Sequence, residues 1–185
     1  MFKIEETLIP GVKILHCRSL ADERGTFTKI FHEHAFSENG LNNRWSESYV
    51  SNSKRGVVRG LHFQTPPADH SKLVYCVAGS VLDAVLDIRV GSPSYGKNVT
   101  VTLSADSGNA IFIPSGVAHG FCTPDQEASL LYFTSSVYDQ QNDTGLLWDS
   151  AGIEWPIESP VTSLRDKTFP TFAKYKSPFT YESPQ

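Results

Sequence analysis

The sequence is short of several features that mark particular classes of protein. No apolar run approaches the roughly 20 residues that a transmembrane helix requires, and the N-terminus lacks the charged, apolar and small-residue order of an export signal. Charge is also modest, since 16 Lys and Arg against 20 Asp and Glu leave a net charge of −4 without long runs of one sign. Neither a membrane surface nor a nucleic-acid partner is therefore expected, and any anionic ligand must be bound by local positive groups.

Cysteine is scarce as well. Cys17, Cys76 and Cys122 are odd in number, widely separated and set in apolar stretches rather than in a Cys-x-x-Cys pair. This arrangement predicts buried free thiols and a reducing compartment. Together with the missing export signal, it favours a cytoplasmic location.

Helical patterns are almost absent too. The chain instead contains short runs rich in Val, Ile, Phe, Tyr and Thr, separated by Gly, Pro, Asn, Asp and Ser, which is typical of an all-β sandwich or barrel. Only residues 33–39 resemble a short helix. The expected strands are 12–17, 26–31, 57–63, 73–77, 81–88, 99–103, 110–113, 120–123 and 129–134.

The length of 185 residues suits a single domain with one substantial core. After Trp155 and Pro156 the chain becomes richer in Pro, Ser and Lys. We therefore expect one domain over residues 1–185, in which residues 157–185 form an irregular extension that wraps the barrel.

Two motifs indicate a cupin-type β-barrel or jelly roll. The second cupin motif is matched by the spacing of Gly108, Pro114, Gly116 and His119. Upstream, residues 59–64 with Lys72 and Gly79 stand where a metal-binding cupin carries His-x-His, Glu and Gly, but only His62 is kept. An ammonium group cannot ligate a metal, yet it can stabilise negative charge that develops on an oxygen. The pocket is therefore predicted to perform acid/base chemistry with no metal and no cofactor.

A longer series of segments runs in order along most of the chain. The segments are Asp22-Glu23-Arg24-Gly25-x-Phe27, 58–64, 72–74, Asp87-Ile88-Arg89-x-x-Ser92-Pro93 and 113–121, then Tyr132, Tyr138, Trp148, 152–156 and Ser163-x-x-Asp166. Each segment alone is weak, but the whole series in this order is hard to explain except by common descent. It resembles the deoxysugar-nucleotide epimerases typified by dTDP-4-dehydrorhamnose 3,5-epimerase.

The resemblance implies four catalytic roles. His62 is the base, Asp166 orients its imidazole, Lys72 stabilises an enolate oxygen and Tyr138 is the opposing acid. Each role suits its side chain, because histidine titrates closest to neutral pH and a phenol with a pKa near 10 can return a proton to a carbanionic carbon. Considered one at a time, Lys72 could instead guard an edge strand, Tyr138 could cap the barrel mouth, and Asp166 could simply pair with a neighbouring basic residue.

The substrate implied by the resemblance is a nucleotide-diphosphate sugar. Arg24 and Arg59 are the candidates for binding its two negative charges, and Arg24 with Phe27 is expected to reach the neighbouring subunit of a homodimer. The remaining candidates for contact with the substrate are Gln64, His119 and Tyr132.

Two segments depart from the common pattern of the family. Thr28-Lys29 replaces x-Glu, and Glu47-Ser48-Tyr49 replaces Gln-x-Asn. We predict that Lys29 and Glu47 form a compensating ion pair in one wall of the pocket, and that Tyr49 reshapes the site near the sugar.

The leading hypothesis is an epimerase that acts at carbon 3, carbon 5 or both of a nucleotide-linked 4-keto-6-deoxy sugar, for polysaccharide or O-antigen assembly or for an antibiotic sugar. A sugar-nucleotide binding protein without turnover and a keto-sugar isomerase on the same barrel remain alternatives. A metal-dependent cupin is disfavoured because His62 and His119 are the only obvious ligands in the two motifs, and His32-x-His34 lacks a nearby third ligand.

Overall fold

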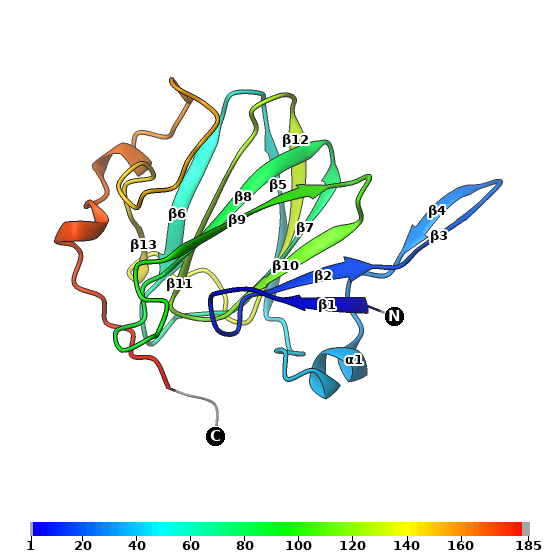
Figure 1. Cartoon of the computed structure of the whole chain (residues 1–185), viewed down its shortest axis with the longest axis horizontal. Helices are drawn as coiled ribbons and strands as arrows, with labels where there is room; N and C mark the ends of the chain where they lie inside the picture. Colours follow the sequence, from blue (N-terminus) through cyan, green and yellow to red (C-terminus); the bar gives the residue numbers. More distant parts are fainter. Residues whose placement is uncertain (1, 183–185) are drawn as a thin grey trace.

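The computed structural model describes residues 2–182. Two large antiparallel sheets form the body of the molecule, one with the strand order β1-β2-β10-β7-β12-β5 and the other with the order β13-β6-β11-β8-β9 (Figure 1). The predicted all-β fold is confirmed. Its elements are β1 (Phe2–Glu6), β2 (Lys13–Cys17), β3 (Ser19–Asp22), β4 (Gly25–Thr28), α1 (Glu33–Glu38), β5 (Glu47–Ser53), β6 (Val58–Gln64), β7 (Lys72–Ala78), β8 (Ser80–Asp87), β9 (Asn98–Ser104), β10 (Asn109–Ile113), β11 (Val117–Cys122), β12 (Ala128–Thr134), β13 (Asp143–Gly145) and the short 3₁₀ turns η1 (Asp166–Thr168) and η2 (Phe172–Lys174).

The main core lies between the two sheets, because alternate residues of each strand point inward. Val74 on β7 and Leu130 on β12 face Val85 on β8 and Phe121 on β11. A second apolar cluster covers the outer face of the five-stranded sheet, where Leu61 packs against the C-terminal part of the chain. β8 is therefore buried on both faces, which explains its nearly continuous apolar sequence.

The same alternation aims polar side chains into one end of the barrel. On β6, Leu61 and Phe63 belong to the outer cluster, whereas His62 and Gln64 line a cavity between the sheets. Two glycines bring this strand close to β11. A Cβ atom on Gly60, which has a φ of +134°, would lie 2.5 Å from the Cα atom of Gly120. The close approach sets His62 directly opposite His119 in the strand register.

Residues 157–182 run over the outer face of the five-stranded sheet (Figure 1). Val161 forms a β-bridge with Val57, and Thr180 forms one with Val90. Between these two attachments, the turn η1 places Asp166 beside β6. The C-terminal segment therefore supplies part of the cavity wall as well as cover for the sheet.

The strands that the sequence patterns missed have few apolar residues. β5 reads ESYVSNS and forms because it pairs with β12 along its whole length. β11 begins at Val117, three residues before the expected start, so His119 lies within a strand. The remaining strands without an expected counterpart are β1, β3 and β13.

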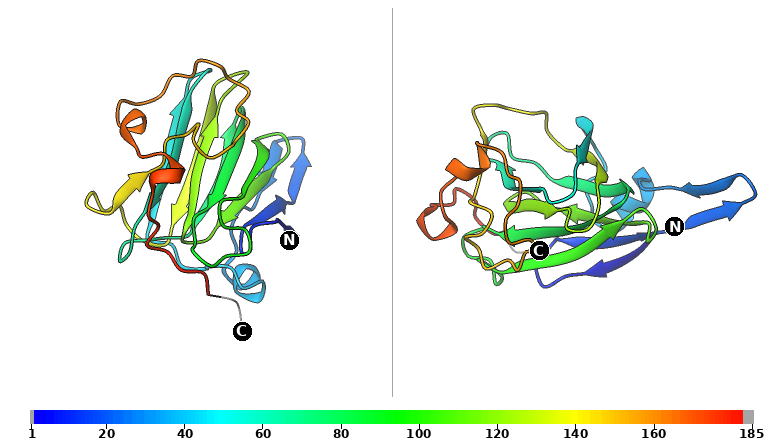
Figure 2. Two further views of the ribbon diagram at one scale, coloured as in Figure 1. Left: turned by 60° about the vertical axis from the view of Figure 1, so that its left-hand side comes forward. Right: turned by 90° about the horizontal axis from the view of Figure 1, so that it is seen from above.

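The strands β3 and β4 form a hairpin that projects away from the two sheets (Figure 2). Its large apolar side chains are exposed, with 53% of Leu20 and 62% of Phe27 accessible to solvent. The cysteines are buried and free, as the sequence predicts. None of the helices in the described part of the chain has the length and hydropathy that crossing a membrane requires.

Candidate active site

A cavity of about 370 Å³ opens between the two sheets at the end of the barrel. Its walls are built by inward-facing residues of β5, β6, β7, β11 and β12, together with the loops that follow β12. Most of the residues proposed from the sequence meet there. They are His62, Lys72, Tyr138, Glu47, Tyr49, Arg59, Gln64, His119 and Tyr132.

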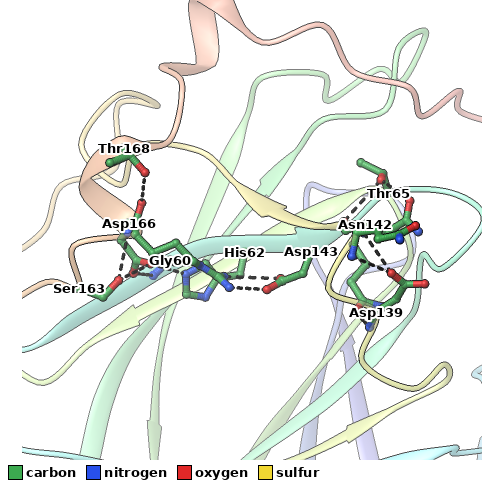
Figure 3. Close-up of polar contacts among 12 residues, drawn as sticks. Gly60, His62, Thr65, Asp139, Asn142, Asp143, Ser163, Asp166 and Thr168 are labelled. Atoms are coloured by element: carbon green, nitrogen blue, oxygen red, sulfur yellow. Dashed lines mark hydrogen bonds and ion pairs between the residues drawn. The ribbon is translucent and has the colours of Figure 1, made fainter.

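His62 is held by Asp166, which lies 104 residues further along the chain. The Nε2 atom of His62 is 3.0 Å from Oδ1 of Asp166. Two further donors fix the carboxylate, since Ser163 donates its hydroxyl to Oδ1 and Gly60 donates its backbone N–H to Oδ2. Figure 3 shows Asp166, Ser163 and Gly60 gathered on one side of His62, with Asp143 on the other.

The electrostatics of this pair favour a neutral imidazole beside an ionised carboxylate. Burial lowers the pKa of His62 below its usual 6.5, although the hydrogen bond to Asp166 opposes the shift. Burial alone would raise the pKa of Asp166, but the hydrogen bonds from His62, Ser163 and Gly60 together lower it. With Asp166 ionised, Nε2 carries the proton that it donates, and Nδ1 is left as the free basic nitrogen.

Lys72 is a buried cation in the same cavity. Its side chain is 6% exposed, and its ammonium donates to the backbone carbonyl of His62 at 3.2 Å. Burial lowers the pKa of Lys72 to about 8, while the charges of Asp143 and Asp83 oppose the shift. The strand β7 lies between β10 and β12, so the alternative role of Lys72 as a guard of an edge strand is wrong.

Tyr138 lies at the mouth of the cavity in the loop that follows β12. Its side chain is 57% exposed. Its backbone N–H donates to the carboxylate of Glu47 at 2.6 Å. Gln64 also contacts this loop, because its amide oxygen accepts the backbone N–H of Asp139 at 2.7 Å. Gln64 was proposed as a contact for substrate, but its polar atoms bind protein groups.

Two tyrosine rings of the six-stranded sheet and the imidazole of His119, beside His62 on β11, form a further part of the cavity wall. Tyr49 on β5 stacks on Tyr132 on β12, with ring centroids 4.7 Å apart. The ring of His119 contacts Tyr132 edge to face, and its Nε2 lies 2.7 Å from Oδ2 of the buried Asp83. Tyr49 therefore lies in the cavity wall with its ring stacked on that of Tyr132, and its effect on the site near the sugar stays a prediction.

Three of the proposed residues lie away from the cavity of their own chain. Arg24 and Phe27 belong to the projecting hairpin, where Arg24 pairs with Asp22. The predicted ion pair between Lys29 and Glu47 does not form within residues 2–182 of one chain, where Lys29 is exposed directly after the projecting hairpin. Glu47 binds the backbone of Tyr138 instead, because β5 carries it to the loop beyond β12 rather than to the hairpin.

Several charged residues of the site were not predicted from the sequence. Asp143 and Arg165 both line the cavity and form an ion pair with each other. Asp143 follows a polar loop and offers no pattern that marks it. Asp83 did carry a signal, because a charged residue at an inward position of the apolar strand β8 must find a partner when buried.

The contacts of Asp166 show whether it pairs mainly with a neighbouring basic residue. Its closest side-chain partners are His62 and Ser163, whereas Arg165 lies 4.0 Å away and pairs more closely with Asp143. The neighbouring basic residue is thus a secondary contact. Among residues 2–182, no group of three or more His, Cys, Asp and Glu side chains is arranged to hold a metal ion.

Comparisons with known proteins identify the family of the chain. The family model described as dTDP-4-dehydrorhamnose 3,5-epimerase matches residues 6–174. The chain is 42% identical to the dTDP-4-dehydrorhamnose 3,5-epimerase of Shigella flexneri over 164 residues, which is 87% of this chain and 91% of the relative. It is 40% identical to the dTDP-4-dehydrorhamnose 3-epimerase of Streptomyces niveus over 162 residues, which is 86% of this chain and 78% of the relative.

Solved structures extend the comparison to the fold. The dTDP-6-deoxy-D-glucose-3,5-epimerase of Legionella pneumophila, in complex with dTDP-4-keto-L-rhamnose, superposes with a TM-score of 0.94 at 30% sequence identity and covers 99% of this chain and 100% of its own. The family match, the sequence identities and the superposition together establish that the chain belongs to the dTDP-4-dehydrorhamnose 3,5-epimerase family.

Proposed function

We propose that this protein inverts one or two carbon centres next to the ketone of a nucleotide-linked 4-keto-6-deoxy sugar, and that His62 is the base. The observation that carries the proposal is the cavity itself, where a neutral imidazole on a buried carboxylate shares the space with the buried ammonium of Lys72. This combination suits the removal of a proton from carbon beside a carbonyl group.

The reaction divides into two proton transfers. In the first, Nδ1 of His62 takes the hydrogen from the carbon next to the ketone, the C–H bond breaks, and its electron pair moves to the carbonyl oxygen to form an enolate. Lys72 stabilises the negative oxygen. In the second, the hydroxyl of Tyr138 gives a proton to the opposite face of that carbon, the ketone re-forms, and the centre is inverted.

The substrate follows from relatives with bound ligands. The Legionella enzyme holds dTDP-4-keto-L-rhamnose, and the dTDP-4-dehydrorhamnose 3,5-epimerase of Bacillus anthracis holds TDP and pyrophosphate. In this chain the guanidinium of Arg59 lines the cavity, donating to Ser53 at 2.9 Å. We propose that Arg59 binds the diphosphate and that the aromatic wall of Tyr49 and Tyr132 contacts the rest of the nucleotide sugar.

Deuterium exchange tests the proposal directly. Purified protein is incubated in D₂O with dTDP-4-keto-6-deoxyglucose, and both deuterium incorporation and product configuration are followed by NMR. We expect deuterium at each carbon that is inverted. Binding of the nucleotide sugar without any exchange would instead identify a binding protein without turnover.

The number of inverted centres is open to the same measurement. The relatives include the 3-epimerase of Streptomyces niveus as well as 3,5-epimerases. Deuterium at carbon 3 alone identifies a single-centre epimerase, whereas deuterium at carbons 3 and 5 identifies the double reaction. Movement of the keto group would identify the isomerase alternative.

We also propose that the protein is a homodimer in which the projecting hairpin reaches the neighbouring cavity. The support is the exposure of Phe27 and Leu20 on a hairpin that contacts little of its own chain, since exposed apolar groups of this kind commonly mark an interface. Sedimentation velocity at micromolar concentration measures the assembly, and a monomer under those conditions would contradict it.

The pH dependence of kcat/KM is expected to be bell-shaped. His62 acts as a base only when unprotonated, and because its pKa is lowered below 6.5, the rate is lost only at pH values below that point. Lys72 stabilises the enolate only when protonated, so the rate falls as the pH rises through about 8, the pKa of Lys72. A rate that remains constant to pH 10 would contradict the role of Lys72.

A further inference from the structure

The loop that carries Tyr138 is held by hydrogen bonds to the backbone of three consecutive residues. Gln64 donates from Nε2 to the carbonyl oxygen of Val137 at 3.2 Å and accepts the N–H of Asp139 through Oε1 at 2.7 Å. Between these two contacts, Oε2 of Glu47 accepts the N–H of Tyr138 at 2.6 Å. The backbone on both sides of the tyrosine is therefore tied to side chains from β5 and β6.

Gln64 is anchored through its side chain, and Glu47 through the strand to which it belongs. Gln64 is 3% exposed and also donates to the carbonyl oxygen of Ala68 at 2.7 Å. Glu47 begins β5 and lies opposite Thr134 in the register with β12, directly before the loop leaves the sheet. Gln64 and Glu47 therefore fix the position of the loop relative to the strands β6 and β5.

The phenol of Tyr138 depends on this support. Within residues 2–182 its hydroxyl makes no recorded hydrogen bond, and the side chain is 57% exposed at the cavity mouth. With no contact to fix the ring at its polar end, the backbone determines where the hydroxyl points. A displacement of about 1 Å in such a group can cost on the order of 100-fold in rate.

We propose that Glu47 is a positioning residue for Tyr138 and thereby decides whether the enolate is reprotonated with inversion. A carboxylate suits the task because it only accepts hydrogen bonds, and a charged acceptor forms a shorter and stronger bond to a backbone N–H than a neutral one. The inference rests on the proposed function, in which Tyr138 supplies the proton on the face opposite His62.

The inference predicts separate effects on the two proton transfers. In Glu47→Ala, His62 still removes the proton, but a displaced Tyr138 returns it less often. The enolate then recovers a deuteron from solvent-exchanged His62 on the original face. The product is deuterated substrate of unchanged configuration, which wild-type enzyme does not accumulate.

The experiment compares inversion with deuterium incorporation in D₂O for wild type, Glu47→Ala and Glu47→Gln. We expect Glu47→Ala to lower the ratio of inversion to incorporation by about 10-fold to 100-fold. Glu47→Gln keeps an oxygen that can accept the same N–H, so its ratio should lie within about threefold of wild type. Glu6→Ala, which removes an exposed glutamate paired with Lys13, is the matched control.

Two results would overturn the inference: an unchanged ratio in Glu47→Ala, or an equal loss of both transfers in a variant that melts at the wild-type temperature. If Glu47→Ala does not fold, the comparison of Glu47→Gln with Tyr138→Phe decides, because the inference requires the first to keep inversion and the second to lose it while retaining exchange. A wild-type protein with neither exchange nor inversion would refute the proposed function instead.

Discussion

Replacement of His62 by asparagine is expected to remove both inversion and deuterium incorporation, with a loss in kcat of about 10²- to 10⁴-fold. The amide of asparagine is too short to replace Nε2 as the donor to Asp166, so the buried carboxylate keeps only its hydrogen bonds from Ser163 and Gly60. The amide has no basic nitrogen and cannot take the proton from carbon. Steady-state rates and NMR-detected exchange measure the two losses together.

The combined loss distinguishes a base from a residue that merely supports the fold. A change at Tyr138 leaves the removal of the proton from carbon intact, whereas a change at His62 stops the reaction at this first step. His16→Asn is the control, because His16 lies at the surface and pairs with Glu5. Retention of exchange in His62→Asn at the wild-type rate would assign the base to another residue.

Replacement of Lys72 by methionine is expected to lower kcat by about 10²- to 10³-fold, since one preorganised donor to a developing oxyanion contributes that much. Methionine has a similar volume and suits a side chain that is 6% exposed. The fold should therefore persist, and the loss should fall on the rate of exchange, which depends on the stability of the enolate.

Lys72→Met carries a second signature. The ammonium of Lys72 is one of the charges that lower the pKa of His62. Its removal raises that pKa, so the acid limb of the pH profile shifts to higher pH, and the decline above pH 8 disappears. Lys13→Met, at a partly exposed lysine paired with Glu6, is the control. An active Lys72→Met variant with the wild-type profile would contradict the role in catalysis.

Asp143 lines the same cavity as His62 and Lys72, the two residues that these predictions change. It pairs with Arg165, which also lies beside Asp166, and its charge supports the protonated state of Lys72. Asp143 therefore forms an ion pair with Arg165 and also influences Lys72 through its charge. This arrangement keeps a positive group available for an anionic substrate in a protein whose net charge is −4.

Much of the fold was predictable because strands that are buried on both faces have a recognisable run of apolar residues. β8 and β10 are apolar on successive residues since both faces are covered, and they were located within a residue or two. β5 was not, because its inward residues Glu47, Tyr49 and Ser51 line a cavity rather than a core. A strand that borders a binding site loses the apolar pattern by which strands are recognised.

The sequence by itself determined the kinds of group at the site and the strands that carry them, since alternation along β6, β7 and β11 aims His62, Lys72 and His119 to one side. Only the tertiary structure decided which groups meet. Asp166 reaches His62 across 104 residues of chain, and Glu47 reaches Tyr138 across 91. Hydrogen bonds between distant segments, and the burial that shifts a pKa, arise from packing, and no local pattern of residues encodes them.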